Sequence, residues 1–381
     1  MDGGFYDGLR VLITGDTGFK GSWLSEWLMS LGSDLLGVSL PPEDVRSMYG
    51  VLPAARYEHV DADIRDEDSM VRLVGAFSPD VIFHLAAQAL VRESYVSPVD
   101  TVSTNVLGTA VVLEAARRSS VQRPCSIVVV TSDKCYANDG SGVRFEETHP
   151  MGGHDVYSAS KGAAELVAAS WRSSFTVGGS AADFRVATAR AGNVLGGGDW
   201  AIDRLVPDMH RALANGEPIL VRNPLATRPW QHVLEPLSGY LLLGMRLATV
   251  GDVQEGWNFG PDAGGVRSVG EVCDAVVRHW GSGEWTTVAE EDALYEAPTL
   301  ELSNDKSRDR LGWRPVWSFD ETIARTVEWY RSGDDVNYSE KAMQELTRTQ
   351  ISEYAAAAKS NGGSQSMIPK DRPSDRSREI E

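Results

Sequence analysis

The sequence places a tyrosine and a lysine four residues apart in the string YSASK, so that Tyr157 and Lys161 would share one face of a helix. A nearby ammonium group favours the ionised form of a phenol, which would allow Tyr157 to act as a base near neutral pH. Ser132 ends an apolar run, where its hydroxyl could meet the same substrate oxygen. The three residues together indicate proton transfer to or from an alcohol, although a YxxxK pair alone also arises by chance on helix surfaces.

A glycine-rich string, TGDTGFKG, lies between an apolar run and a helical pattern. Gly15 permits a tight turn, Gly18 lets the backbone approach a pyrophosphate, and Gly21 lets the helix pack closely on the strand. The helix begins near Thr17 and Phe19, and its amino end would offer N–H donors and a positive dipole to the phosphates. This context predicts a site for a dinucleotide cofactor.

The second expected strand does not decide between NAD and NADP. It ends in SLPP without the usual acidic residue, and no arginine stands there for a 2′-phosphate, which favours NAD. Asp63 and Ile64, at the end of the third expected strand, could hold the adenine edge. The alternative for these two residues is a solvated turn.

Apolar runs alternate with helical patterns through the first half of the chain. We expect strands at 9–15, 34–40, 57–64, 81–87 and 126–132, with helices near 19–31, 64–77 and 105–117. This alternation predicts an α/β fold, a Rossmann-type doubly wound parallel sheet covered by helices on both faces.

The pattern loosens after Asn193, where we expect loops and short elements at Gly196–Trp200, Asn223–Trp230 and Ala289–Leu300. These segments predict a smaller C-terminal α/β substrate domain. The expected division is a nucleotide-binding domain at 8–193, with returning segments around 225–260, and a substrate domain mainly at 194–335. Residues 336–381 would form a C-terminal extension that is disordered from about 360.

Composition excludes several classes of partner. The formal net charge of −18 would repel a phosphate backbone, so nucleic acid is not an expected partner. No long uncharged apolar stretch predicts a membrane span, and the amino end does not look like a signal peptide. Three cysteines without paired spacing fit the reducing cytoplasm. The scattered histidines predict no metal site.

The order TGxxGFKG, HLAAQ, Asn105, Ser132 and YSASK resembles the extended short-chain dehydrogenases/reductases that act on nucleotide sugars. The longer strings TGDTGFKGSWL, TSDKCY, RAGNVLGGGDWAIDRLVPD and RNPLATRPWQHVLEPLSGY are similar to the CDP-glucose 4,6-dehydratase family, and the resemblance covers roughly residues 8–335. It implies a tightly held NAD contacted also by Leu85, Ala86 and Ala87, CDP-glucose as substrate, and a homodimer or higher homo-oligomer.

The reaction implied by this resemblance converts CDP-glucose to CDP-4-keto-6-deoxyglucose and water. Tyr157 would take the proton of the 4-hydroxyl while hydride passes from C4 to NAD, to be returned later to C6. Loss of water needs a further acid and base, and the resemblance assigns these to Asp133 and Lys134. An aspartate acid needs a raised pKa, and a lysine acts as a base only where its pKa is lowered. The alternative is a turn with an Asp–Lys surface pair.

Four polar residues in the second half could bind the substrate: Asn193, Arg204, Arg222 and Arg228. Arginine suits a pyrophosphate because its planar fork makes two charge-assisted hydrogen bonds. The resemblance implies that Arg228 grips the pyrophosphate and that Asn193 touches the nucleotide sugar. Any single arginine could instead be a solvated surface charge.

Two departures from the family pattern are visible. Asp16 stands where many members have histidine, and its charge should repel the cofactor phosphates unless it points away or caps the helix. Ala89 replaces a frequent proline. Three alternatives stay open: another nucleotide-sugar 4,6-dehydratase, a 4-epimerase and, more remotely, a non-catalytic NAD-sensing binding protein. His84, on an apolar strand, is expected to be a satisfied core residue.

Overall fold

The computed structural model describes residues 4–42, 46–53, 56–175, 183–202, 204–288 and 300–361. At its centre lies a seven-stranded sheet in the order β12–β7–β5–β4–β1–β2–β3, in which every pairing is parallel. Its strands are Arg10–Thr14 (β1), Asp34–Ser39 (β2), Glu58–Asp61 (β3), Val81–His84 (β4), Cys125–Val130 (β5), Phe184–Ala191 (β7) and Gly256–Phe259 (β12). The strand order reverses at β1, so the predicted doubly wound Rossmann sheet is confirmed.

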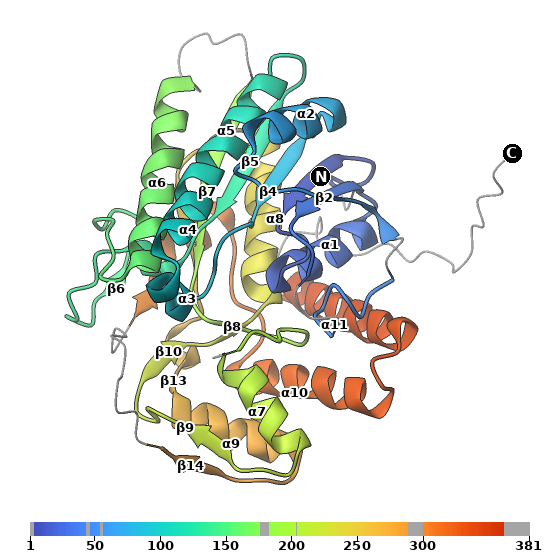
Figure 1. The fold of residues 1–381 in the computed structure, drawn as a ribbon, viewed down its shortest axis with the longest axis vertical. Coiled ribbons are helices and arrows are strands. Elements are labelled where there is room, and N and C mark those ends of the chain that lie inside the picture. Colours follow the sequence, from blue (N-terminus) through green and yellow to red (C-terminus); the bar gives the residue numbers. More distant parts are fainter. Residues whose placement is uncertain are drawn as a thin grey trace, which may run out of the picture.

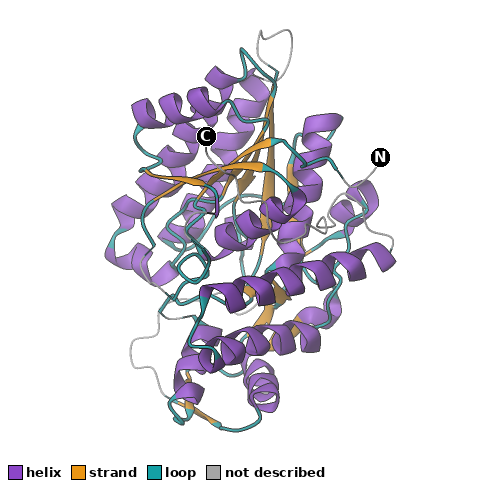
Figure 2. Ribbon diagram, turned by 90° about the vertical axis from the view of Figure 1, so that its right-hand side faces the viewer, coloured by secondary structure: helices purple, strands orange, loops and turns teal. Residues whose placement is uncertain are grey.

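Alternating side chains of the strands feed two hydrophobic layers, one on each face of the sheet. In β1, Val11 and Ile13 pack toward one layer, and Leu12 packs toward the other. The first layer is covered by α1 (Phe19–Leu31), α8 (Leu234–Thr249) and α11 (Glu340–Ser360), and the second by α2 (Glu67–Phe77), α5 (Gly108–Ser119) and α6 (Val156–Phe175). Figure 2 shows helices on both sides of the strands.

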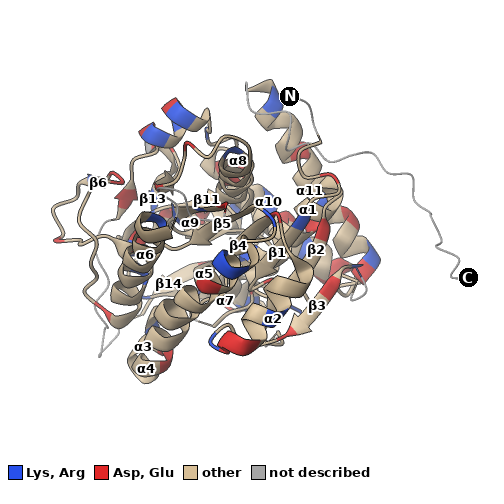
Figure 3. Ribbon diagram, turned by 90° about the horizontal axis from the view of Figure 1, so that it is seen from above, with Lys and Arg blue, Asp and Glu red and all other residues tan. Residues whose placement is uncertain are grey.

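The outer surface of the second layer carries ion pairs between neighbouring helices. Arg118 at the end of α5 contacts Glu67 of α2 at 2.9 Å and Glu114 of its own helix at 2.8 Å. Figure 3 shows basic and acidic residues along these two helices. The apolar faces of both helices pack on the sheet, and their charged faces are directed at solvent.

A smaller group of elements lies below the sheet in Figure 1. It contains α7 (Leu205–Ala214), α9 (Val269–Trp280) and α10 (Phe319–Asp335), with the short strand pairs β9 (Ile219–Val221) with β14 (Trp285–Thr287) and β10 (Thr227–Pro229) with β13 (Val266–Ser268). Both α9 and α10 begin with a capping box, formed by Ser268 with Glu271 and by Ser318 with Glu321. The division of the chain into domains at 193 and 335 stays a prediction.

Several short elements complete the described fold. They are α3 (Val91–Val96), α4 (Pro98–Val102), a π-helical turn at Ser103–Leu107, β8 (Val194–Leu195) paired with β11 (Gln231–His232), and β6 (Arg144–Phe145) paired with β15 (Glu301–Leu302). β8 lies between the sheet and the lower elements in Figure 1. Because β8 follows β7 and β11 precedes α8, their pairing joins the end of β7 to the start of α8.

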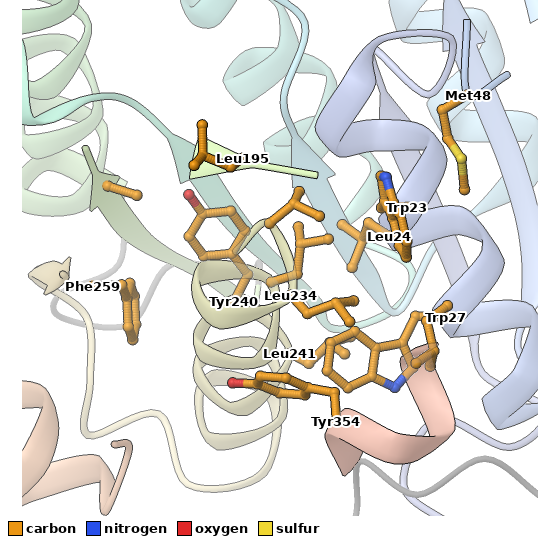
Figure 4. Close-up of a cluster of buried hydrophobic side chains, with 14 of the residues drawn as sticks. Trp23, Leu24, Trp27, Met48, Leu195, Leu234, Tyr240, Leu241, Phe259 and Tyr354 are labelled. Atoms are coloured by element: carbon orange, nitrogen blue, oxygen red, sulfur yellow. The ribbon is translucent and has the colours of Figure 1, made fainter. Parts of the chain in front are cut away.

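The C-terminal extension is anchored by α11, which packs against α1 and α8 (Figure 4). The rings of Trp27 and Tyr354 meet edge to face with centroids 5.7 Å apart. The hydroxyl of Tyr354 also donates to Glu235 of α8 at 2.6 Å. The expected disorder from about residue 360 and most of the expected loop Ala289–Leu300 lie outside the described residues. Within the described ranges, no helix has the length and hydropathy needed to cross a membrane.

Candidate functional site

The glycine turn after β1 has the form that a pyrophosphate site requires. Gly15 adopts φ +78°, and a Cβ there would lie 2.6 Å from the backbone nitrogen of Ala86. A Cβ on Gly21 would come within 2.0 Å of the Gly15 carbonyl oxygen, so α1 can approach the turn only with glycine at that position. Gly18 begins α1 without a side-chain cap, which leaves the first-turn N–H groups to face the space above β1.

Asp16 is fully buried, and its carboxylate is turned toward β2 and β3. It accepts hydrogen bonds from Ser39 Oγ at 2.7 Å and from Tyr57 OH at 2.9 Å, and it contacts His59 Nδ1 at 2.8 Å. A Cβ on Gly37 would lie 2.1 Å from Asp16 Oδ2, so this glycine makes room for the carboxylate. The geometry matches the case in which the acidic side chain points away from the phosphates.

The end of β4 supports the same turn. Leu85 and Ala86 donate to the carbonyl and the hydroxyl of Thr14 at 3.0 and 3.4 Å. His84 is buried between Thr14 Oγ1 at 2.7 Å and Thr109 Oγ1 at 3.1 Å. Burial lowers the pKa of His84 to about 3, so the ring is neutral and belongs to the core.

The predicted adenine contacts at Asp63 and Ile64 have side-chain partners of their own. Asp63 forms a two-oxygen ion pair with Arg65, at 3.0 and 2.6 Å, and this contact lowers the pKa of the carboxyl. Ile64 is a core residue that fills the space above Gly108. The cofactor role of both residues stays a prediction.

Ser132 and Asp133 lie directly beyond β5, in a tight turn of Asp133–Cys135. Ser132 Oγ caps the turn by accepting from the Lys134 nitrogen at 3.2 Å and donates to Asp133 Oδ1 at 3.0 Å. Asp133 is 2% exposed, and its Oδ2 has no partner among the described residues. Burial raises the pKa of this carboxyl, against the opposing effects of Lys134 and Ser132, which is the property that a general acid needs.

Tyr157 and Lys161 lie on the first turns of α6, and both are buried. Burial raises the pKa of Tyr157 to about 12, while a hydrogen bond with Ser132 and the positive charge of Arg204 oppose that rise. Burial lowers the pKa of Lys161 to about 8. The sequence pattern predicted Lys161 as the cation that favours the phenolate, whereas in the structure the positive charge that lowers the pKa of Tyr157 is that of Arg204. The role of Lys161 stays a prediction.

A pocket brings the turn after β5 together with part of the predicted substrate site. Its lining includes Asp133 and Lys134 of that turn together with Asn193 and Arg228, and is completed by Tyr136, Asn138, Gly153, His154, Asp155, Ser158 and Leu300. Arg228 is 9% exposed, although it carries a charge. A buried guanidinium that faces a pocket is suited to hold an anionic ligand.

The remaining two predicted arginines lie elsewhere. Arg204 stands beside α1 and α6, 3.6 Å from Asp199, and its charge acts on Tyr157. Arg222 is exposed at the end of β9 and does not line the pocket. The four residues singled out in the sequence are therefore not one cluster.

Two features of the site were not predicted. Lys20 of α1 lies near Asp133, Lys161 and Arg204; burial and the two neighbouring cations lower its pKa to about 8. Asp155 begins α6 by accepting from the Ser158 nitrogen at 2.9 Å and from its hydroxyl at 2.6 Å. The position of Lys20 in the glycine string was visible in the sequence, but only the fold brings its side chain to the catalytic turn.

The fold and the groups gathered beyond β1, β4 and β5 define an enzyme of the short-chain dehydrogenase/reductase class. The family model described as GDP-mannose 4,6 dehydratase matches residues 12–326, and the chain belongs to this family. A relative from Salmonella typhimurium, named CDP-glucose 4,6-dehydratase, is 42% identical over 365 residues, which cover 94% of this chain and 99% of the relative.

Solved structures agree with this assignment. The dTDP-glucose 4,6-dehydratase of Streptomyces venezuelae, solved with NAD and TYD bound, superposes with a TM-score of 0.73 and 26% identity over 88% of this chain and all of that one. The UDP-glucose 4-epimerase of Thermus thermophilus, solved with NAD, has a TM-score of 0.73 and 25% identity, with 85% of this chain and 99% of that chain covered. Dehydratases and epimerases thus share the fold, and the site must distinguish them.

Proposed function

We propose that this chain is a CDP-glucose 4,6-dehydratase, which converts CDP-glucose to CDP-4-keto-6-deoxyglucose and water. The observation that carries the proposal is the buried Asp133, a carboxyl of raised pKa placed beside Ser132 and in one pocket with Lys134. Water loss from the sugar needs such an acid and a base beyond the tyrosine, whereas epimerisation does not. The name of the Salmonella typhimurium relative supports CDP-glucose among the nucleotide sugars.

The residues present fit NAD. The turn at Gly15 and Gly21 has no room for a Cβ, and the amino end of α1 offers N–H groups to a pyrophosphate. The family resemblance adds Thr17, Phe19 and the segment Leu85–Ala87 to this cradle. When bound, NAD supplies reversible hydride acceptance, so that the sugar is oxidised at C4 and reduced at C6 within one turnover.

The protein's own groups move the protons. Tyr157 takes the proton from the 4-hydroxyl oxygen, with Ser132 as its hydrogen-bond partner and the charges of Lys161 and Arg204 favouring the phenolate. Asp133 gives its proton to the departing 6-hydroxyl, and the amine of Lys134 removes the proton on C5, which the 4-ketone makes acidic. Each of these roles is part of the proposal.

The substrate diphosphate is held by Arg228, and Asn193 lines the same pocket. Arg204 contributes charge at the tyrosine. Arg222 is exposed outside the pocket, and its contact with the substrate stays a prediction.

The enzyme forms a homodimer through α3, α4 and α6, which lie side by side (Figure 1). Large apolar side chains are exposed on these helices, including Val99 of α4 at 80% and Leu166 of α6 at 62%. An apolar patch on a chain with net charge −18 is suited to a second copy, because it avoids charge repulsion at its centre. Light scattering should give twice the mass of one chain, and Leu166→Glu should reduce the measured mass to that of a single chain.

The three unpaired cysteines favour the cytoplasm as the location of the protein.

The first experiment incubates the purified protein with CDP-glucose and NAD, and follows product by mass and by the alkaline absorbance of the 4-keto sugar. Loss of one water without net formation of NADH is expected. If only dTDP-glucose or UDP-glucose reacts, the nucleotide of the proposed substrate would be wrong and the proposed dehydration would stand. Isomerisation without water loss, unaffected by Asp133→Asn, would establish the 4-epimerase alternative instead.

A further inference from the structure

A buried ion pair joins α6 to β7 behind the catalytic groups. Glu165 and Arg190 are 4% and 6% exposed, and the guanidinium donates to both carboxylate oxygens, at 2.9 and 2.8 Å. Glu165 follows Lys161 by one helical turn, on the face of α6 that is directed at the sheet. This contact therefore lies directly behind the tyrosine-bearing helix.

The carboxylate of Glu165 is completed by two threonines. Thr131 Oγ1 donates to Oε1 at 2.5 Å, and Thr188 Oγ1 donates to Oε2 at 2.7 Å. Burial alone would raise the pKa of Glu165, but the charge of Arg190 and these hydrogen bonds bring it below its ordinary value. The group is thus a fixed anion with four donors. Thr131, one of those donors, immediately precedes Ser132.

The guanidinium of Arg190 reaches the other end of the same turn. Its Nη1 donates to Tyr136 OH at 2.7 Å, and Tyr136 OH donates to Asn258 Oδ1 of β12 at 2.7 Å. Tyr136 directly follows the turn that carries Asp133 and Lys134. The ion pair is therefore bonded to the residue before the turn and to the residue after it.

We propose that the Glu165–Arg190 pair is a positioning element, which fixes the acid-bearing turn after β5 relative to the tyrosine-bearing helix α6. The inference rests on the proposed dehydratase function, because it requires Tyr157 and Asp133 to act on one sugar, at the C4 hydroxyl and the C6 hydroxyl. Replacing a buried ion pair with apolar side chains is often neutral or stabilising, so stability alone does not account for one at this position. A need for precise spacing accounts for the ion pair, because groups that act in sequence on one substrate must be held within fractions of an ångström of their working positions.

The test compares Glu165→Gln with wild type in steady state and in a single turnover. Glutamine keeps the side-chain size but loses the charge that orients Arg190. We expect kcat to fall by about 100-fold, while KM for CDP-glucose changes by less than about threefold. Because the first proton transfer needs only α6 and Ser132, reduced cofactor should accumulate in the single turnover, seen by its absorbance, before water is lost. A purely structural role would reduce the amount of active enzyme without this accumulation.

Glu235→Gln is the matched control. Glu235 is also fully buried and accepts from Tyr354 OH and from the backbone of Val316 and Trp317, but it contacts neither catalytic segment. We expect it to change stability and to leave kcat and the single-turnover trace as in wild type. Equal loss of kcat in both variants, with the same trace, would overturn the inference.

A second variant decides the matter if Glu165→Gln does not fold. Tyr136→Phe keeps the ion pair and the ring but removes the hydroxyl that links Arg190 to the turn. It should reproduce the accumulation of reduced cofactor with a smaller loss of kcat, and a wild-type trace would overturn the inference. If wild-type protein dehydrated no nucleotide sugar, the proposed function would fail together with the inference; wild-type turnover with unaltered variants would refute the inference alone.

Discussion

Replacing Asp133 by asparagine should separate activity from stability. Asparagine has nearly the same shape, and its side-chain oxygen can still accept the hydrogen bond that Ser132 Oγ donates to Asp133 Oδ1 at 3.0 Å. The variant loses the proton that the departing 6-hydroxyl requires. General acid catalysis contributes about 10²–10⁴-fold, and we expect kcat to fall by that factor. The first proton transfer should persist, so bound cofactor becomes reduced while little product forms.

The same substitution should stabilise the fold at high pH. Asp133 is buried, and its Oδ2 is without a partner among the described residues; asparagine places an amide group at the same position, so the expected gain comes from removing the buried negative charge. Because burial raises the pKa of Asp133 above its ordinary 3.8, wild type loses stability relative to the variant as the pH rises through that raised pKa. The gain in unfolding free energy should therefore be larger at pH 8 than at a pH below 3.8.

Product formation and thermal unfolding at the two pH values measure both effects. Asp139→Asn, in the exposed loop beyond the turn, serves as control and should change neither. A kcat within tenfold of wild type would remove Asp133 as the acid. An Asp133→Asn protein that is less stable than wild type at pH 8 would contradict the burial argument.

Three further predictions concern cofactor, substrate and pH. Gly21→Ala places a Cβ 2.0 Å from the Gly15 oxygen and should lower the unfolding free energy by about 1–3 kcal/mol or more and weaken NAD binding by calorimetry, whereas Gly264→Ala, with open space, should not. Arg228→Lys should raise KM for CDP-glucose by about tenfold, whereas Arg222→Lys should leave KM unchanged in the same assay. Burial raises the pKa of Glu235 from 4.5 to about 7, so the unfolding free energy should fall across that pH range. In denaturant titrations, Glu235→Gln should remove about 3 kcal/mol of this fall.

The sheet could be predicted because its signal is local. Each expected strand is a short apolar run, and β1, β2, β4 and β5 begin and end within a few residues of those runs. Strands buried on both faces must be apolar throughout, so their positions follow from the residues alone. Alternation of strands with helices predicts parallel pairing in the same way, whereas the order of the strands within the sheet was not predicted.

Side chains of the site were harder to predict, because their positions depend on contacts between distant segments. Arg222 and Arg228 belong to one short segment, yet β10 pairs with β13 and brings Arg228 into the pocket, while Arg222 stays exposed at the end of β9. Lys20 reaches the catalytic turn only because β1 and β5 flank β4 in the sheet. No spacing along the chain distinguishes these outcomes.

The C-terminal extension contains a helical repeat of buried residues that the sequence analysis did not predict. Met343, Thr347, Gln350, Tyr354 and Ala358 recur at helical spacing, and all five are buried in α11. Thr347 and Gln350 are polar, so a pattern of apolar residues alone does not reveal this repeat. Their donor groups find partners within the fold: Gln350 Nε2 donates to the Arg325 carbonyl at 3.0 Å, for example.

Asp16 shows why a departure from a family pattern cannot be judged from its own position. Read alone, a carboxylate in a phosphate-binding turn predicts repulsion of the cofactor. In the structure, the Asp16 carboxylate contacts Ser39, Tyr57 and His59, which lie more than twenty positions further along the chain. Gly37 leaves room for it, because a Cβ there would overlap Asp16 Oδ2. Because these partners take up both oxygens and turn them toward β2 and β3, the charge is stabilised inside the protein. The effect of Asp16 on the phosphates thus depends on β2 and β3 as much as on the turn that contains it.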